Sequence, residues 1–345
     1  MKDSLESLLT RAISIASKFL LVGFLAKELS LNDYGGFQLV SYFVLISTTV
    51  FGLELYNLTN RAIPKTRNQI NIYEEHLSFF CTTFPVVVVF QIILFLLLFP
   101  IELITLTNVA LVFVVGLCDY FSQEVYRYLM INKSFRKGNL QLIYKGLFFV
   151  GFLFLYNFFF GSLSFREVLW IMGFSYFLLF IFALHSFRNT LYSFKKDSFS
   201  LLSKTKLYHN LKSVAPFLVL IVFLKGIEFS DKFIISKKLG LEETGVYSFL
   251  FAVASAIHIF VVSGFYIIYL PKLIKLHSFK SGSFGKELLT FGAITFVSSV
   301  ILVFIVPLIS PFIFEIIGKS EFSSQTSLLY FLLVGFMLNN LSLIP

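Results

Sequence analysis

Charged side chains are scarce in this chain: Asp, Glu, Lys and Arg make up only 14% of its 345 residues. A soluble domain carries about 25% of such residues. Because 57% of the residues are hydrophobic, the polar side chains are too few to cover a surface that faces water. The apolar runs recur along the whole length, so a single cleaved signal peptide does not explain them. These shortages exclude an ordinary soluble domain.

Motifs for covalent or metal chemistry are also missing. The two cysteines, Cys81 and Cys118, lie inside apolar runs and lack the number and spacing of a disulfide framework or a metal site. The sequence has no glycine-rich dinucleotide fingerprint, no phosphate-binding loop, no paired histidines at metal-ligand spacing and no nucleophile elbow. We therefore expect no enzymatic activity, no cofactor and no metal. The net charge of +9 comes without nucleic-acid motifs, so we expect no nucleic-acid partner.

Long apolar runs are abundant instead. The run from Leu77 to Phe99 has no charged residue, and the run from Gly245 to Leu270 has only His258 as a titratable side chain near its middle. Each is longer than the roughly 20 residues that a helix needs to cross a bilayer, and neither alternates like a barrel strand. The pattern predicts an all-α integral membrane protein, a polytopic bundle of about ten spans at residues 4–27, 35–59, 77–99, 105–131, 140–160, 168–187, 213–236, 245–270, 288–311 and 327–345.

The basic residues favour one orientation of these spans. Lys and Arg number 17 in one set of alternate loops and 5 in the other set. Short loops rich in Lys and Arg stay on the cytoplasmic side of a membrane. We therefore expect a multi-pass membrane protein whose N-terminus is cytoplasmic, and we interpret the net positive charge as a signal of topology.

One turn occurs twice in the sequence. LSLNDYGGF at Leu29–Phe37 and LGLEETGVY at Leu239–Tyr247 are 210 positions apart and share leucines, an acidic residue, a glycine and an aromatic residue at matching positions. The ends of the third and ninth expected spans are also similar, because FPIELI at Phe99–Ile104 resembles PFIFEII at Pro311–Ile317. Six spans separate the copies, so an internal repeat of this kind inserts both copies in the same orientation.

The repeat predicts two helical bundles. We expect a six-helix N-terminal bundle at residues 1–210 and a four-helix C-terminal bundle at residues 211–345. The second copy then lacks counterparts of two spans, which indicates either a shortened form or a fragment. Parallel repeats are typical of transporters whose substrate path follows a central cavity between the halves.

Several charged residues fall inside the expected spans, where they are costly and usually face the bundle interior or a watery cavity. Arg11 and Lys18 are seven residues apart on one helical face, and Glu228 and Lys232 have the i,i+4 spacing of a favourable pair. The hypothesis of a cavity rests on a set of charges in the first, second, fourth, fifth and seventh spans: Arg11, Lys18, Glu54, Asp119, Glu124, Lys145, Lys225, Glu228, Asp231 and Lys232.

Without a nucleotide motif, transport has to draw on an ion gradient or on the gradient of the substrate. The acidic residues Glu54, Asp119, Glu124, Glu228 and Asp231 are therefore candidates for coupling to an ion, with Glu228 and Asp231 the strongest. A purely structural interpretation stays open, because cations near span ends can reach the interface and pairs such as Glu228 with Lys232 can simply neutralise each other.

Two segments resemble a known family. GFLAKELSLNDYGGFQLVSYFVLISTTVFGLELYNLTNRAIP resembles the opening of bacterial polysaccharide flippases of the O-antigen (Wzx) type, in which an acidic, glycine-containing turn follows the first span. SDKFIISKKLGLEETGVYSFLFAVASAI resembles the start of the second half in the same family, with Asp231, Lys232, Gly245 and Tyr247 at the recurring positions. The motif is typical of the multidrug/oligosaccharidyl-lipid/polysaccharide exporter superfamily, whose members have about twelve spans in two MATE-like bundles.

The resemblance implies a function in the bacterial inner membrane. A flippase of this type moves undecaprenyl-pyrophosphate-linked oligosaccharides to the outer face for O-antigen, lipopolysaccharide, capsule or exopolysaccharide synthesis. Its partners are the lipid-linked oligosaccharide, membrane lipids and other polysaccharide assembly proteins. The cations Arg11, Lys18, Lys145 and Lys225 are then expected to bind the pyrophosphate.

Two alternatives stay open. A MATE-type multidrug or cation exporter of the same superfamily predicts that acidic residues dominate the cavity, whereas the first span here is basic. A polytopic polysaccharide polymerase or ligase predicts a long outward loop with charged catalytic residues. The sequence does not identify the sugar, the coupling ion or the oligomeric state.

Overall fold

The computed structural model describes residues 2–62, 69–132, 134–192, 201–278 and 283–342. These residues are helical almost throughout, and no strand occurs among them. Several of the basic loop residues that set the expected orientation, among them Lys65, Arg67, Lys195 and Lys196, lie outside this described part of the chain.

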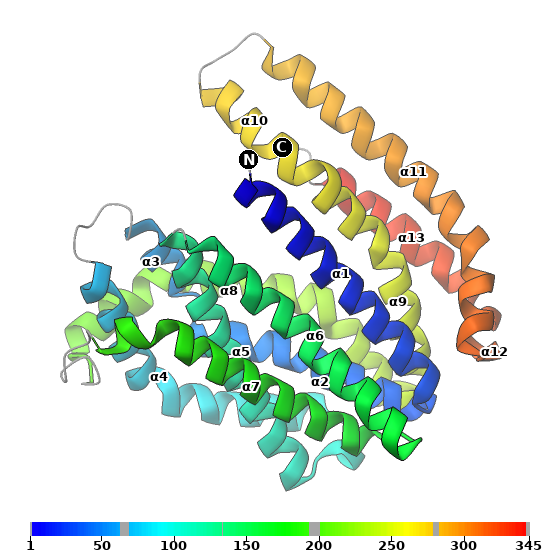
Figure 1. Cartoon of the computed structure of the whole chain (residues 1–345), viewed down its shortest axis with the longest axis horizontal. Helices are drawn as coiled ribbons and strands as arrows, with labels where there is room; N and C mark the ends of the chain where they lie inside the picture. The colour runs from blue at the N-terminus through cyan, green and yellow to red at the C-terminus, as the bar shows by residue number, and fades with distance from the viewer. Residues whose placement is uncertain (1, 63–68, 133, 193–200, 279–282, 343–345) are drawn as a thin grey trace. The chain divides into compact units, whose positions relative to one another are not determined.

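The helices follow one another with short connections (Figure 1). In chain order they are α1 (Lys2–Glu28), α2 (Leu31–Gly52), α3 (Tyr56–Ala62), α4 (Gln69–Leu98), α5 (Leu106–Ile131), α6 (Phe135–Phe160), α7 (Phe165–Tyr192), α8 (Lys204–Lys238), α9 (Leu241–Val261), α10 (Ile267–Ser278), α11 (Phe284–Ile317), α12 (Ser320–Ser324) and α13 (Thr326–Leu341). A 3₁₀ turn at Ile101–Leu103 precedes α5, and a π-helical turn at Val262–Tyr266 joins α9 to α10.

Eight helices within the described residues are long and apolar enough to cross a membrane. Each of them coincides with one of the ten expected spans. The first expected span corresponds to α1, which is not one of these eight, and the tenth corresponds to α13, an apolar helix of 16 residues. The chain is thus an all-helical protein with the composition of a multi-pass membrane protein.

The second span ends earlier than the sequence predicts. The expected range reached residue 59, but α2 ends at Gly52 because Leu53 and Glu54 adopt positive φ angles of 43° and 59°. Neither residue is a glycine, and the left-handed region is uncommon for other residues. A short helix, α3, begins at Tyr56.

The two similar turns interrupt the helices at matching positions, but the backbone differs between them, because Ser30 has a φ of −60° and the matching Gly240 has a positive φ. In the first, α1 ends at Glu28 and α2 begins at Leu31; in the second, α8 ends at Lys238 and α9 begins at Leu241. Both breaks thus keep the spacing of 210 residues. Ser30 caps α2 by accepting a hydrogen bond from the Asp33 amide at 3.0 Å. Gly240 has a φ of 100°, which a residue with a side chain rarely adopts.

The other expected correspondence is not reproduced locally. Pro100 follows the end of α4 and precedes the 3₁₀ turn, whereas Pro311 lies inside α11, which continues to Ile317. The similarity of these two segments therefore does not extend to their conformation.

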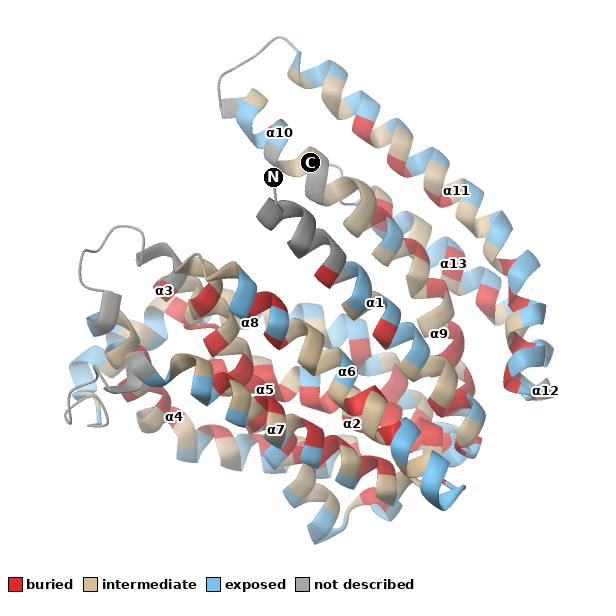
Figure 2. Ribbon diagram, in the orientation of Figure 1, coloured by how far each residue is buried: buried red, intermediate tan, exposed pale blue. Residues whose placement is uncertain are grey.

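The chain divides into two compact units. The first contains residues 1–21 and 28–244, and the second contains residues 22–27 and 245–345. This division falls after the expected bundle boundary at residue 210, because α8 packs against α2 and α3. In the first unit α2 is the central helix: it packs against α4, α5, α7 and α8, and most of its residues are buried (Figure 2). In the second unit α11 packs against α10, α12 and α13.

Candidate functional site

A buried ion pair joins α5 to α6 in the first unit. Asp119 of α5 is 1% exposed, and its Oδ1 accepts a hydrogen bond from the Lys145 amine of α6. Gln123, one turn further along α5, donates its Nε2–H to Asp119 Oδ2 at 2.9 Å. The Lys145 amine also lies 5.6 Å from the ring centre of Tyr176 on α7. Both carboxylate oxygens therefore have a donor, which offsets part of the cost of burying the charge.

Lys18 of α1 adds a second cation to this pair. α1 approaches α6 closely, since a Cβ atom on Gly146 would lie 3.2 Å from the Ser17 Cβ atom. Lys18 follows Ser17 and interacts electrostatically with both Lys145 and Asp119. We name Lys18, Asp119 and Lys145 the lysine cluster. It contains two cations and one carboxylate, so a single positive charge stays uncompensated within it.

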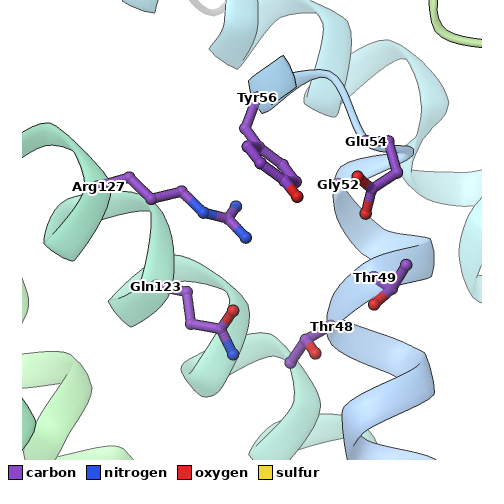
Figure 3. A pocket seen from close by; sticks show the side chains of 7 residues that line it. All are labelled: Thr48, Thr49, Gly52, Glu54, Tyr56, Gln123 and Arg127. Atoms are coloured by element: carbon purple, nitrogen blue, oxygen red, sulfur yellow. The ribbon is translucent and has the colours of Figure 1, made fainter. Parts of the chain in front are cut away.

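A small polar cavity lies where α2 ends. Its volume is about 20 Å³, enough for one water molecule. Figure 3 shows that side chains from α2, from the α2–α3 connection, from α3 and from α5 surround it; the lining residues are Thr48, Thr49, Gly52, Glu54, Tyr56, Gln123 and Arg127. The lining offers both donors and acceptors for a bound water.

Glu54 is the buried acid of this cavity. The residue is 5% exposed, and its Oε2 accepts a hydrogen bond from Asn57 Nδ2 at 2.7 Å. Burial raises the pKa of the Glu54 carboxyl group, while hydrogen bonds from Tyr56 and Asn57 and the positive charge of Arg127 act in the opposite direction. Glu54 is thus easier to protonate than an exposed glutamate.

Arg127 closes the other side of the cavity. Its guanidinium lies 3.7 Å from the ring centre of Tyr56 and donates to Glu124 on the same helix. The second oxygen of Glu124 is 3.8 Å from His76 Nε2, which lies 3.2 Å from the Tyr120 hydroxyl oxygen. Arg127 is therefore held by its ion pair with Glu124 and by its contact with the Tyr56 ring. Glu124, which the sequence predicts as an intramembrane acid, thus has Arg127 and His76 as neighbours.

The charges of α8 form a separate group. Lys225 pairs with Glu228 at 2.6 Å, while the Lys232 amine donates to Asp231 Oδ1 at 2.9 Å and to the backbone carbonyl of Glu228 at 2.7 Å. The Glu228 carboxylate thus pairs with Lys225, three residues earlier, while Lys232 also interacts electrostatically with Glu228. Lys232 is fully buried, and its amine lies 5.6 Å from the ring centre of Tyr42 on α2.

The predicted site residues all belong to the first unit. The structure brings Lys18, Asp119 and Lys145 together. Glu54 follows the end of α2, and Glu124 of α5 pairs with Arg127, which lines the same cavity as Glu54. The remaining predicted residues, Lys225, Glu228, Asp231 and Lys232 of α8, form two ion pairs with one another. The side chain of Arg11 lies outside the described residues. That the two expected bundles line a common cavity stays a prediction.

Sequence reasoning missed several residues of the site, among them Gln123, Tyr56 and Tyr176. A signal for the first exists, because Asp119, Gln123 and Arg127 recur every four residues and form a polar stripe along α5. Tyr56 and Tyr176 give no comparable signal, since aromatic residues are abundant along the whole chain.

A hydrogen-bonded cluster of three polar side chains in the second unit connects α9, α11 and α13. His258 has its Nδ1 2.8 Å from Asn340 Oδ1, and Asn340 Nδ2 donates to Ser299 Oγ at 3.1 Å. Asn340 and Ser299 are fully buried. Every member has a hydrogen-bond partner, so this group stabilises the contact of the three helices.

An apolar groove of about 450 Å³ lies on the first unit between α6 and α7. Aromatic side chains dominate its lining, among them Phe152, Phe174 and Trp170, the single tryptophan of the chain.

Comparison with protein-family models and with curated proteins finds no match to this sequence, and comparison with solved structures finds no match to its fold. Among the described residues, no group of three or more His, Cys, Asp or Glu side chains is placed to hold a metal ion.

Proposed function

We propose that the protein is a flippase that carries a lipid-linked oligosaccharide across the bacterial inner membrane. The observation that carries this proposal is the lysine cluster, in which two lysines, Lys145 and the exposed Lys18, share one buried carboxylate. An uncompensated cation in such surroundings favours an anionic ligand. The resemblance of the two turn segments to O-antigen flippases supports the same assignment.

The lysine cluster suits a pyrophosphate group. Asp119 holds Lys145 in place, so Lys18 is the cation that is available to the ligand. An ammonium group binds phosphate oxygens as a point charge through charge-assisted hydrogen bonds. The polyprenyl chain stays among hydrocarbon chains, for which the groove at Trp170 offers an apolar surface. We also propose that about ten spans form two bundles, which open the cavity alternately to the two sides of the membrane.

A drug or cation exporter needs the opposite charge balance at its binding site. Cationic substrates are attracted by acidic residues, whereas the lysine cluster has a positive balance. The acids of α8 do not reverse this argument, because Glu228 and Asp231 each have an adjacent lysine as partner.

Flipping in vesicles tests the proposal. The purified protein is reconstituted into phosphatidylcholine vesicles with undecaprenyl-pyrophosphate-linked N-acetylglucosamine, and an added galactosyltransferase labels only the sugar on the outer leaflet. We expect Lys18→Gln to slow labelling of the inner pool about tenfold or more, because a hydrogen bond to a charged group contributes about 1.5–3 kcal/mol. Lys18→Arg is expected to retain part of the rate.

Lys238→Gln is the matched control, because Lys238 is an exposed lysine at the end of α8. Equal slowing in Lys18→Gln and Lys238→Gln would contradict a role of the lysine cluster. A wild-type rate no faster than that of protein-free vesicles would reject the flippase, and transport of a cationic dye by the same vesicles would favour the exporter.

A further inference from the structure

The acid at the end of α2 is shielded in a way that the acids of α8 are not. Glu54 is 5% exposed, whereas the side chains of Glu228 and Asp231 are 46% and 35% exposed and each has a neighbouring lysine. A carboxyl group that is buried and incompletely paired changes its protonation more readily near neutral pH than a solvated one.

The backbone around Glu54 is strained. Leu53 and Glu54 have φ angles of 43° and 59°, in a region that residues other than glycine rarely adopt. Two consecutive left-handed residues interrupt the helix and direct the Glu54 carboxyl group to the cavity, beside the Tyr56 hydroxyl (Figure 3). Strain of this kind persists where surrounding contacts enforce it, and it often marks a functional position.

Gln123 lies between Glu54 and the lysine cluster. Its Nε2 donates to Asp119 Oδ2 at 2.9 Å, and the same side chain lines the cavity that Glu54 lines. With the amide nitrogen committed to Asp119, the amide oxygen is the acceptor that Gln123 offers to the cavity. A water there has Glu54, Gln123 and donors such as Arg127 within one small space, which matches the two to four partners that buried waters need.

The charged and titratable groups around Glu54 come from three helices. Tyr56 of α3 donates a hydrogen bond to it, and Arg127 and Glu124 of α5 act on it with opposite charges. His76 of α4 joins the group through Glu124. Towards α8 the neighbouring residue Leu55 packs in an apolar cluster with Phe79 and Val214.

We propose that Glu54 is a proton-binding residue and that a water in the cavity joins its carboxyl group to Gln123, and through Gln123 to Asp119. The proton comes from solvent and adds to the Glu54 carboxylate, leaving a neutral carboxylic acid. The water then receives a hydrogen bond from Glu54 instead of donating one to it. Gln123 is a positioning residue that carries this change to the Asp119–Lys145 pair. This inference rests on the proposed function, in which it assigns the coupling ion.

Infrared difference spectroscopy of the purified full chain in detergent tests the site without any substrate. The protein is titrated between about pH 4 and about pH 8, and isotope-labelled glutamate separates glutamate bands from aspartate bands. We expect a protonated-carboxyl band that titrates above the range of exposed glutamates, disappears in Glu54→Gln and returns in Glu54→Asp as an aspartate band. Glu102→Gln is the control, because Glu102 is an exposed glutamate that belongs neither to the lysine cluster nor to the lining of the Glu54 cavity.

The link through Gln123 has its own readout. In the wild type the carboxylate band of an aspartate is expected to shift as Glu54 is protonated, whereas in Gln123→Met the Glu54 band persists and the aspartate band no longer responds. An unchanged protonated-carboxyl band in Glu54→Gln would overturn the proton site, and an unchanged aspartate response in Gln123→Met would overturn the link. Because no transport is measured, failure of the flipping assay leaves these outcomes distinguishable.

Discussion

Removing the charge of Asp119 is the sharpest perturbation that the structure offers. Asp119 is 1% exposed and pairs with Lys145, whose side chain is 30% exposed. Asp119→Asn keeps the shape but leaves Lys145 without its anion and beside Lys18. Breaking a buried ion pair on one side costs about 3–5 kcal/mol. Because Lys145 is partly exposed and can turn away, we expect a loss at the lower end of this range.

A double-mutant cycle separates the ion pair from other effects of the substitution. The variants are Asp119→Asn, Lys145→Met and the double variant, and their free energies of unfolding are measured by denaturant titration in detergent. The double variant is expected to be at least about 1 kcal/mol more stable than Asp119→Asn, because replacing both partners of a buried pair is often neutral. Lys18→Gln in the Asp119→Asn background should also recover stability by removing the repulsion from Lys145.

Two outcomes would refute this reasoning. A loss below about 1 kcal/mol in Asp119→Asn would mean that the pair is solvated like a surface ion pair. A double variant less stable than either single variant would mean that the side chains contribute independently. The cycle also has a functional reading: a stable double variant that no longer flips its substrate indicates that the charges serve binding as well as folding.

Two further predictions concern the end of α2. Gly52→Ala is expected to destabilise the protein by about 1–3 kcal/mol, because the new Cβ atom would lie 2.9 Å from a ring carbon of the buried Tyr120. Gly151→Ala is the control, because a Cβ atom at Gly151 would have no atom within 4 Å. This variant should have a free energy of unfolding up to about 1 kcal/mol higher than wild type in the same titration. Because burial raises the pKa of Glu54, its contribution to stability is present at low pH and is lost as pH rises through the raised pKa. The melting temperature of Glu54→Gln relative to wild type should therefore rise with pH above about pH 4 and level off once Glu54 is ionised; a difference independent of pH would contradict the shift.

The helices were predictable because their signal is local. Runs of about 20 apolar residues fix the spanning segments, and eight of the ten expected spans have a helix of suitable length and composition. The end of α2 was not predictable, because Leu53 and Glu54 are ordinary helix formers. Their conformation depends on contacts outside the segment, such as the packing of Leu55 against Phe79 of α4 and Val214 of α8.

The pairing of the charges was predictable only in part. The positions of Asp119 and Lys145 mark both as intramembrane charges, but their contact joins residues 26 positions apart and depends on how α5 packs against α6. Within α8 the spacing favoured Glu228 with Lys232, yet Glu228 pairs with Lys225. Spacings of three and four residues stabilise a helical pair by similar small amounts, so the spacing alone does not decide between the partners.

The charge balance of the lysine cluster bears on its purpose. A static role in holding α5 to α6 needs only one cation and one anion, and Asp119 with Lys145 supplies them. Lys18 adds a charge that this role does not need and that repels Lys145. Lys18 is exposed, so its charge can be compensated by solvent or by an anionic ligand. On the proposed function the anionic ligand is the pyrophosphate of the substrate. In the proposed hydrogen-bonded path, protonation of Glu54 acts through the cavity water and Gln123 on Asp119, and it alters how firmly Asp119 holds Lys145.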